Sequence, residues 1–152
     1  MNKAKLINEI FTENNIETVP VFGYELLREV LIPDLLGKDA AEILYWAGKK
    51  LARKYPLKSY EEAVHFFQEA GWGQLTLKSE KKNEQEFELE GPIVTKRLSK
   101  KEECFFQLEA GFLAQQIEHQ KNVVSEGYEQ PKKRGGKVQF TIKWDSKDSS
   151  PY

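Results

Sequence analysis

One cysteine and two histidines are the side chains best suited to nucleophilic or metal chemistry: Cys104, His65 and His119. A thiol beside a histidine can act as a nucleophile, and a thiol near a helix N-terminus ionises more readily. Neither histidine has a spacing that brings it to Cys104, and Glu103 opposes ionisation of the thiol. A structural zinc site needs about four Cys or His ligands, so no metal site is expected. Free cysteines are usually packing residues, and the sequence leaves both interpretations of Cys104 open.

The segment that begins with this cysteine, CFFQLEAGFLAQQIEHQ over residues 104–120, predicts a long helix. Apolar side chains surround most of its circumference up to Ala114, which is typical of a central helix, and the following glutamines predict that it leaves the core. Such a helix either lines a ligand cavity or closes a core, and the sequence leaves both open. The candidate cavity residues are Cys104, Phe105, Phe106, Leu108, Gly111, Phe112 and Trp72.

The composition indicates one globular domain whose net charge favours no highly charged partner. The chain has 152 residues, of which 39% are hydrophobic and 12% aromatic, enough to build a core. Its 23 Lys and Arg nearly balance 24 Asp and Glu, so nucleic acid is not an expected partner, and residues 131–137 are interpreted as a basic hairpin turn. One cysteine and only short apolar runs indicate a cytoplasmic protein without a transmembrane segment. We expect an N-terminal arm over 1–18, one domain over 19–145 and a polar tail over 146–152.

Apolar spacing predicts three amphipathic helices in the first half of the chain. The first covers residues 22–31 and is expected to end at Pro33, because proline interrupts the hydrogen-bond ladder. The second covers 40–54, and the third covers 60–70 with Ser59 as its N-cap. These helices form one layer of the expected fold.

The spacing of the apolar residues then changes from the period of a helix to that of a strand. Residues 75–78 and 86–90 alternate and predict a hairpin that turns near KKNEQ, whereas 92–100 is either a short helix or an irregular crossover. Residues 138–144 give the clearest half-buried strand, with 123–130 as its partner. This order predicts an α+β fold in which an antiparallel sheet of about four strands packs against a helical layer.

Several of these stretches together resemble a known family. They are YELLREVLIPDLLG, YWAGKKLARKYPL, FFQEAGWGQLTL, FELEGPI, CFFQLEAGF, YEQPKKR and TIKWDSKD. In this order, over about residues 20–148, they resemble the YslB family of small uncharacterised proteins of Gram-positive bacteria. That family is similar in turn to the vinyl-reductase-like domain, whose fold is shared with subunits of the vesicle-tethering TRAPP complex and with the nitric-oxide-sensing haem domain. The resemblance implies a TRAPP-like α+β fold, often dimeric through its first helices, with an apolar interior that holds a small hydrophobic ligand or an acyl chain.

The sequence departs from these wider relatives in two places. Glu129 and Val138 stand about where vinyl-reductase-like domains commonly carry a pair of cysteines, and the Tyr–x–Ser–x–Arg motif of the haem sensors is absent. Neither haem nor a metal is therefore expected, and no cofactor is predicted. No catalytic residues are predicted either.

Three hypotheses about function remain. The leading one is a non-enzymatic dimeric module that binds a small apolar ligand or acyl group in an internal cavity and acts through a protein partner. The alternative is a ligand-free structural subunit that works as a homodimer, and a cysteine-dependent enzyme comes third. The candidate dimer-interface residues are Phe22, Leu26, Leu27, Val30, Ala40, Ala47 and Gly48.

Overall fold

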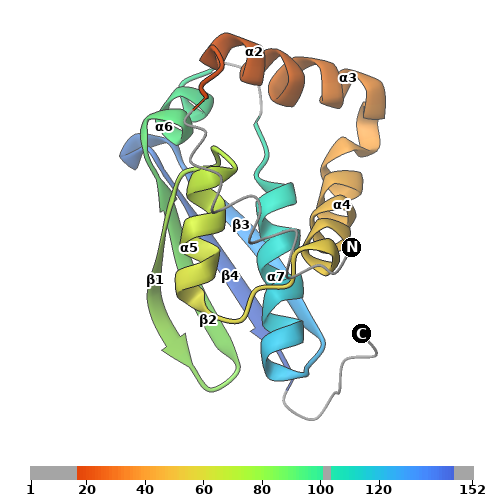
Figure 1. Cartoon of the computed structure of the whole chain (residues 1–152), viewed down its shortest axis with the longest axis vertical. Coiled ribbons are helices and arrows are strands. Elements are labelled where there is room, and N and C mark those ends of the chain that lie inside the picture. Colours follow the sequence, from red (N-terminus) through yellow and green to blue (C-terminus); the bar gives the residue numbers. More distant parts are fainter. Residues whose placement is uncertain (1–16, 101–103, 146–152) are drawn as a thin grey trace.

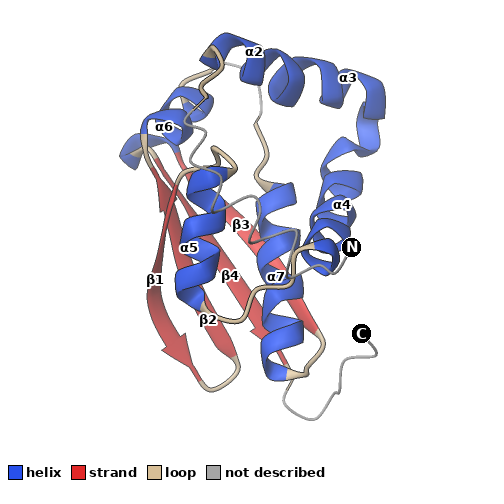
Figure 2. Ribbon diagram, viewed as in Figure 1, coloured by secondary structure: helices blue, strands red, loops and turns tan. Residues whose placement is uncertain are grey.

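The computed structural model describes residues 17–100 and 104–145, which form a four-stranded sheet with helices on one of its faces (Figures 1 and 2). The strands are antiparallel and lie in the order β1-β2-β4-β3. Their bounds are Gln74–Lys81 for β1, Glu84–Glu90 for β2, Ser125–Lys132 for β3 and Lys137–Trp144 for β4. The predicted α+β fold, an antiparallel sheet packed against a helical layer, is confirmed.

The helices α5 and α7 pack on the sheet, and α4 packs against α7 on the side away from α5 (Figure 1). The short helix α6 stands at one end of the sheet, and a helical run over residues 21–36, here called the strap, crosses the same end of the molecule. The strap consists of α2 (Val21–Glu25), η1 (Leu26–Leu31) and α3 (Ile32–Leu36). The other elements are η2 (Gly37–Asp39), α4 (Ala40–Lys54), α5 (Tyr60–Glu69), α6 (Pro92–Leu98), α7 (Gln107–Lys121) and η3 (Lys133–Gly135).

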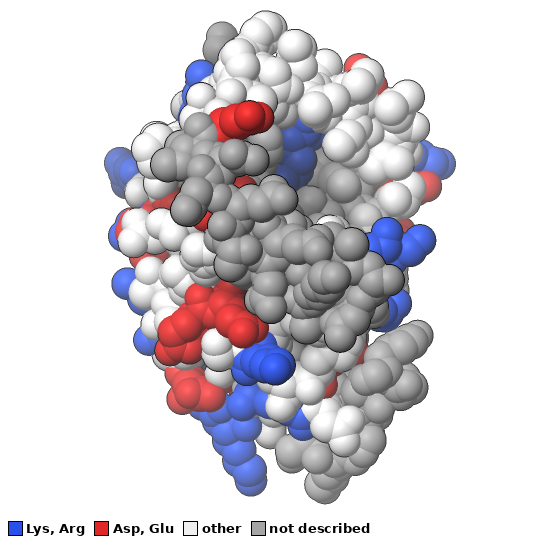
Figure 3. Space-filling view, in the orientation of Figure 1, with Lys and Arg blue, Asp and Glu red and all other residues white. Residues whose placement is uncertain are grey.

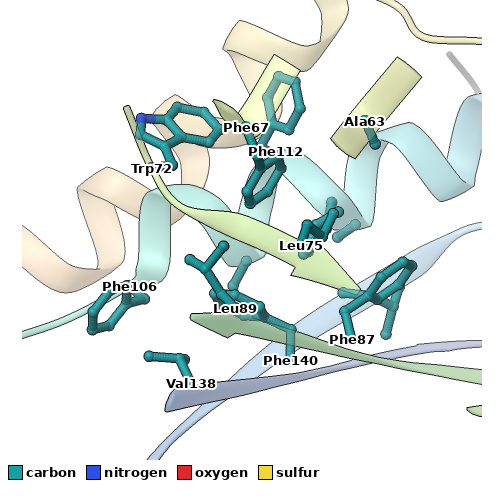
Figure 4. Packing of buried hydrophobic residues seen from close by; sticks show 14 of the residues in the cluster. Ala63, Phe67, Trp72, Leu75, Phe87, Leu89, Phe106, Phe112, Val138 and Phe140 are labelled. Carbon is teal, nitrogen blue, oxygen red and sulfur yellow. The ribbon is translucent and has the colours of Figure 1, made fainter. Parts of the chain in front are cut away.

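Alternation along the strands separates the two faces of the sheet. The apolar side chains of β2 and β4 point toward α7 and the helical layer, where they meet the aromatic residues of the helices (Figure 4). The intervening positions are charged or polar and lie on the other face, where Glu88 pairs with Lys78 and Lys137. One face is thus buried and the other is polar, as expected for a two-layer antiparallel fold.

Glycines allow α4 and α7 to cross in direct backbone contact. A Cβ atom at Gly48 would overlap the carbonyl oxygen of Leu108, and one at Gly111 would overlap the carbonyl oxygen of Tyr45. At Gly127 on β3 a Cβ would lie 2.6 Å from the carbonyl oxygen of Ala110 on α7. The α4–α7–β3 packing therefore depends on residues without side chains.

A tyrosine from the helical layer closes part of each open edge of the sheet. On β1, the Tyr60 hydroxyl accepts a hydrogen bond from the amide of Leu77 at 3.0 Å and donates one to the carbonyl of Leu75 at 3.3 Å. On β3, the Tyr45 hydroxyl accepts from the amide of Gly127 at 2.9 Å. Occupied edge groups no longer template pairing with another strand.

Most of the predicted helix boundaries agree with the structure. The second helix spans Ala40–Lys54, and the Ser59 side chain caps α5 by accepting from the amide of Glu62 at 3.2 Å. The segment left open over 92–100 contains α6, whose first turn holds Pro92. Proline is favoured there because a first-turn residue needs no amide hydrogen.

Two boundaries were predicted wrongly. Pro33 does not end the first helix: the preceding turns are π-helical, and Pro33 falls in the first turn of α3, where its missing amide hydrogen costs nothing. The long helix begins at Gln107 rather than at residue 104. Cys104 therefore precedes the helix and is not positioned by its N-terminus.

Candidate functional site

A buried cluster of charges joins the strap to the body of the protein. Glu109, fully buried on α7, accepts from Arg28 of the strap at 2.6 Å and from Arg97 of α6 at 3.1 Å. Arg97 also pairs with Glu29 of the strap, donates to the carbonyl of Phe105 at 2.9 Å and lies over the Phe106 ring at 3.9 Å. We call Arg28, Glu29, Arg97 and Glu109 the Glu109 cluster.

The cluster keeps Glu109 ionised in a place where a lone carboxylate would be protonated. Burial by itself raises the pKa of Glu109, but the charges of Arg28 and Arg97 lower it below its ordinary value. Burial likewise lowers the pKa of Arg97, whereas Glu109 and Glu29 raise it further above its ordinary value. Both partners are therefore charged at neutral pH, and each depends on the other.

The strap turns its charged side toward the body and its apolar side outward. Arg28 is buried, whereas Phe22 and Leu27 on the outer side are 61% and 57% exposed. In Figure 3 the surface along this end of the molecule is mostly uncharged, in contrast to the mixed charges over the strands and α5. The exposed large apolar residues of the strap are Val21, Phe22, Leu26, Leu27, Val30, Leu31 and Leu35.

The strap residues predicted for a dimer interface are thus all on the surface, but two of the predicted residues of α4 are not. Ala40 and Gly48 are buried inside the chain, and Gly48 lies against the backbone of α7. Ala47 is exposed on α4, as are Ile43 and Trp46, whose exposed fractions are 41% and 57%. Small residues at helical spacing do not reveal whether they pack within one chain or between two.

Aromatic rings fill the interior beside the middle of α7. Phe112 stacks on Phe66 with ring centroids 4.6 Å apart, and Trp72 lies edge-on to Phe112 at 5.2 Å and to Phe67 at 4.9 Å (Figure 4). Of the predicted cavity residues, Phe106 and Phe112 are fully buried, Gly111 and Trp72 are buried, and Leu108 is half-buried against the same core. Here the side chains of the predicted cavity pack against one another.

Cys104 and Phe105 instead line an open hollow of about 640 Å³, here called the Cys104 hollow. Its walls include Leu98 of α6, Pro131 at the end of β3 and Lys133. Burial raises the pKa of the Cys104 thiol to about 11, although the nearby charge of Arg97 acts in the opposite direction. The thiol is therefore protonated at neutral pH and is a poor nucleophile.

A second open hollow of about 640 Å³, here called the β3 groove, runs between α4 and the edge of β3. It shares Ala41, Gln107 and Glu129 with the lining of the Cys104 hollow, so the two hollows adjoin. Glu129 holds this junction together, because its carboxylate accepts from the Phe106 amide at 2.8 Å and from the Gln107 side chain at 2.6 Å. Burial raises the pKa of Glu129, while these hydrogen bonds act to lower it.

The second half of α7 does not leave the core as predicted. Gln115, Gln116 and Glu118 are all buried. Segments distant in the sequence supply partners for Gln116 and Glu118, whereas the Gln115 amide nitrogen lies 3.0 Å from His119 Nε2 one turn further along the same helix. Gln116 accepts from the amide of Leu57 at 2.9 Å, and Glu118 pairs with Lys49 of α4 at 3.0 Å. Polar residues in a helix do not by themselves indicate exposure when other elements can bond them.

The Glu109 cluster was not predicted from the sequence either. Its one signal was Glu109 itself, a charged residue inside the apolar stretch CFFQLEAGFLA, where a buried carboxylate requires a cationic partner. Which arginines supply that charge depends on how the strap and α6 meet α7, so no spacing along the chain identifies Arg28 and Arg97.

Over 17–100 and 104–145, no group of three His, Cys, Asp or Glu side chains is placed to hold a metal ion. No helix in this part of the chain is long and apolar enough to cross a bilayer.

The architecture defines a class of small two-layer α+β domains that includes solved structures. A vinyl-4-reductase family protein from Methanocaldococcus jannaschii superposes with a TM-score of 0.68 over 93% of this chain and 94% of that one, at 20% identity. An unliganded Fe(II) H-NOX protein from K. algicida superposes with a TM-score of 0.54 over 97% of this chain and 89% of that one, at 13% identity. At these identities the likeness concerns the fold alone.

Sequence comparison identifies the family within this class. Residues 21–143 match the family described as "Protein of unknown function (DUF2507)". The chain is 58% identical over 146 residues to the "Uncharacterized protein YslB" of Bacillus subtilis (strain 168), covering 96% of this chain and 98% of that protein. The chain therefore belongs to the DUF2507 family, and the predicted resemblance to the YslB family is confirmed.

Proposed function

We propose that this protein is a non-enzymatic cytoplasmic module that works as a homodimer through the outer face of the strap. The observation that carries the proposal is the orientation of the strap, which buries Arg28 and exposes Phe22 and Leu27. An amphipathic helix normally buries its apolar side, so a helix that exposes it indicates a partner surface. A second copy of the chain offers the same apolar face and can form a symmetric interface.

Sedimentation equilibrium tests the homodimer. We expect the wild type to sediment at twice the chain mass of 17.6 kDa, and Leu27→Glu to sediment as a monomer, because the new carboxylate would be buried without a partner. Gln68→Glu on the exposed surface of α5 adds the same charge away from the strap and should remain dimeric. A monomeric wild type, or a dimeric Leu27→Glu, would contradict the proposal.

A second candidate function is the binding of a small apolar ligand or acyl group, reported to a protein partner. The observation that favours it is the Cys104 hollow, in which an unionised thiol and Phe105 face an open space of about 640 Å³. Native and denaturing mass spectra of gently purified protein distinguish the outcomes. A mass lost on denaturation, or an adduct on Cys104, supports the ligand, and the bare chain mass in both spectra removes it.

The raised thiol pKa bears on the third possibility, a cysteine-dependent enzyme. Because the thiol stays protonated until about pH 11, we expect iodoacetamide to alkylate Cys104 in the folded protein much more slowly than in urea. Mass spectrometry over time at neutral pH follows the reaction. Rapid alkylation of the folded chain would show an activated thiol and would revive the enzymatic hypothesis.

A further inference from the structure

The β3 groove combines aromatic walls with carboxylates. Trp46 of α4 and Tyr128 of β3 line it while remaining 57% and 49% exposed. Each ring already lies near a lysine ammonium of the chain: Lys49 is 5.7 Å from the Trp46 centroid, and Lys143 is 5.9 Å from that of Tyr128. Aromatic faces attract cations through their quadrupole, and both rings keep exposed surface beyond these lysines, so the walls offer further surface to a positively charged ligand.

The charges that line the groove favour the same sign of ligand. Glu42, Glu126 and Glu129 all line it, and within the described residues no Lys or Arg forms an ion pair with any of them. The Glu126 carboxylate accepts from the Tyr128 hydroxyl at 2.7 Å, which leaves its charge uncompensated. The lining includes one cation, Lys49, whose ammonium is already bonded to Glu118 at 3.0 Å and to the carbonyl of Ser125 at 3.3 Å. The groove therefore has an excess of negative charge beside apolar surface.

An added β-strand would not fit this edge. The amide of Ser125 donates to Glu118 at 3.1 Å, and the amide of Gly127 donates to the Tyr45 hydroxyl at 2.9 Å. Pro131 has no amide hydrogen to offer. Because these positions of β3 cannot donate to another backbone, the groove suits a compact ligand better than an extended peptide.

We propose that the β3 groove binds a small organic cation with an apolar body, such as a quaternary ammonium compound that carries an aromatic ring. Trp46 and Tyr128 would contact the cation and its ring, while Glu42 and Glu126 balance its charge. A carboxylate or phosphate ligand would instead meet the excess negative charge of the groove. The site does not involve the outer face of the strap, so it is independent of the proposed dimer.

Titration of the full chain with benzyltrimethylammonium, followed by ¹H–¹⁵N NMR, tests the proposal. We expect saturable shifts of the Trp46 indole N–H and of the amides of Gly127 and Tyr128. Benzyl alcohol and benzylsulfonate keep the ring but remove or reverse the charge, and both should bind at least about fivefold more weakly. Equal or tighter binding of either compound would overturn the proposal.

Charge removal on the protein provides the matched comparison. The double variant Glu42→Gln with Glu126→Gln should weaken benzyltrimethylammonium binding by about fivefold, because the balancing carboxylates are lost. The control, Glu61→Gln with Glu69→Gln, neutralises two exposed carboxylates of α5 and should bind as the wild type does. Equal affinity of the two double variants would refute the site. Leu27→Glu should bind the probe normally even if it is monomeric, which separates failure of the dimer from failure of the groove.

Discussion

The strap and the middle of α7 are held by different kinds of contact. α7 packs through Phe112 and its aromatic neighbours, which exclude water and need no partner of defined charge. The strap is held by Arg28 and Glu29, whose contacts depend on the charge of Arg97 and Glu109. In the strap, buried charges therefore face the body of the protein while large apolar side chains face outward.

Disrupting the aromatic packing of α7 should have the largest effect on stability. We expect Phe112→Ala to lower the free energy of unfolding by about 4 kcal/mol, because the substitution leaves a cavity among rings that cannot close it. Urea unfolding followed by circular dichroism measures the loss. Phe105→Ala, at a half-buried position beside the Cys104 hollow, should cost much less. Equal losses would mean that the aromatic cluster is not the main source of stability.

Disrupting the Glu109 cluster should have the next largest effect on stability, and the strap should lose its protection first. Glu109→Gln leaves Arg28 and Arg97 without their buried counter-charge, and we expect a loss of about 3 kcal/mol. Hydrogen exchange should show lost protection in the strap before that of β2 and β4. Glu118→Gln removes another buried carboxylate of α7, one that pairs with Lys49 instead, and should leave the strap protected. If hydrogen exchange of the strap were similar in Glu109→Gln and Glu118→Gln, Glu109 would not be the carboxylate that holds the strap.

The same cluster should make the stability of the fold depend on pH in the acidic range. Because the folded pKa of Glu109 lies below its ordinary value of 4.5, ionised Glu109 stabilises the fold at neutral pH. That contribution is lost as the pH falls below 4.5 toward the lowered folded pKa. As the pH is lowered across this range, the unfolding midpoint should therefore fall less steeply for Glu109→Gln than for the wild type. Identical slopes would show that Glu109 does not contribute to the pH dependence of stability.

The smallest effect is expected at the exposed end of the strap. Lys96 pairs with Glu25 at 3.3 Å, but the lysine side chain is 55% exposed and water screens the attraction. Lys96→Ala should leave the midpoint of urea unfolding and the exchange of the strap unchanged. A measurable loss would show that the exposed pairs of the strap contribute as the buried ones do.

Local patterns in the sequence were sufficient to predict much of the fold. The period of two in 138–144 predicted β4, and the helical stripe over 40–54 predicted α4 with its observed bounds. Both predictions succeed because burial of one face imposes a periodicity that neighbouring residues display. The family resemblance, likewise, depended on ordered blocks of sequence and needed no coordinates.

The candidate sites required the tertiary structure. The positions of Arg28 and Arg97 around Glu109, of Lys49 beside Glu118, and of the β3 groove beside α4 all join segments that are distant in the sequence. The spacing of charged or small residues along the chain does not identify their contact partners. The sequence was therefore equally consistent with Gly48 in a dimer interface and with Gly48 in the interior. The sequence by itself determined which elements form and which faces are apolar, whereas only the packing of those elements decided which charges meet and which apolar face stays uncovered.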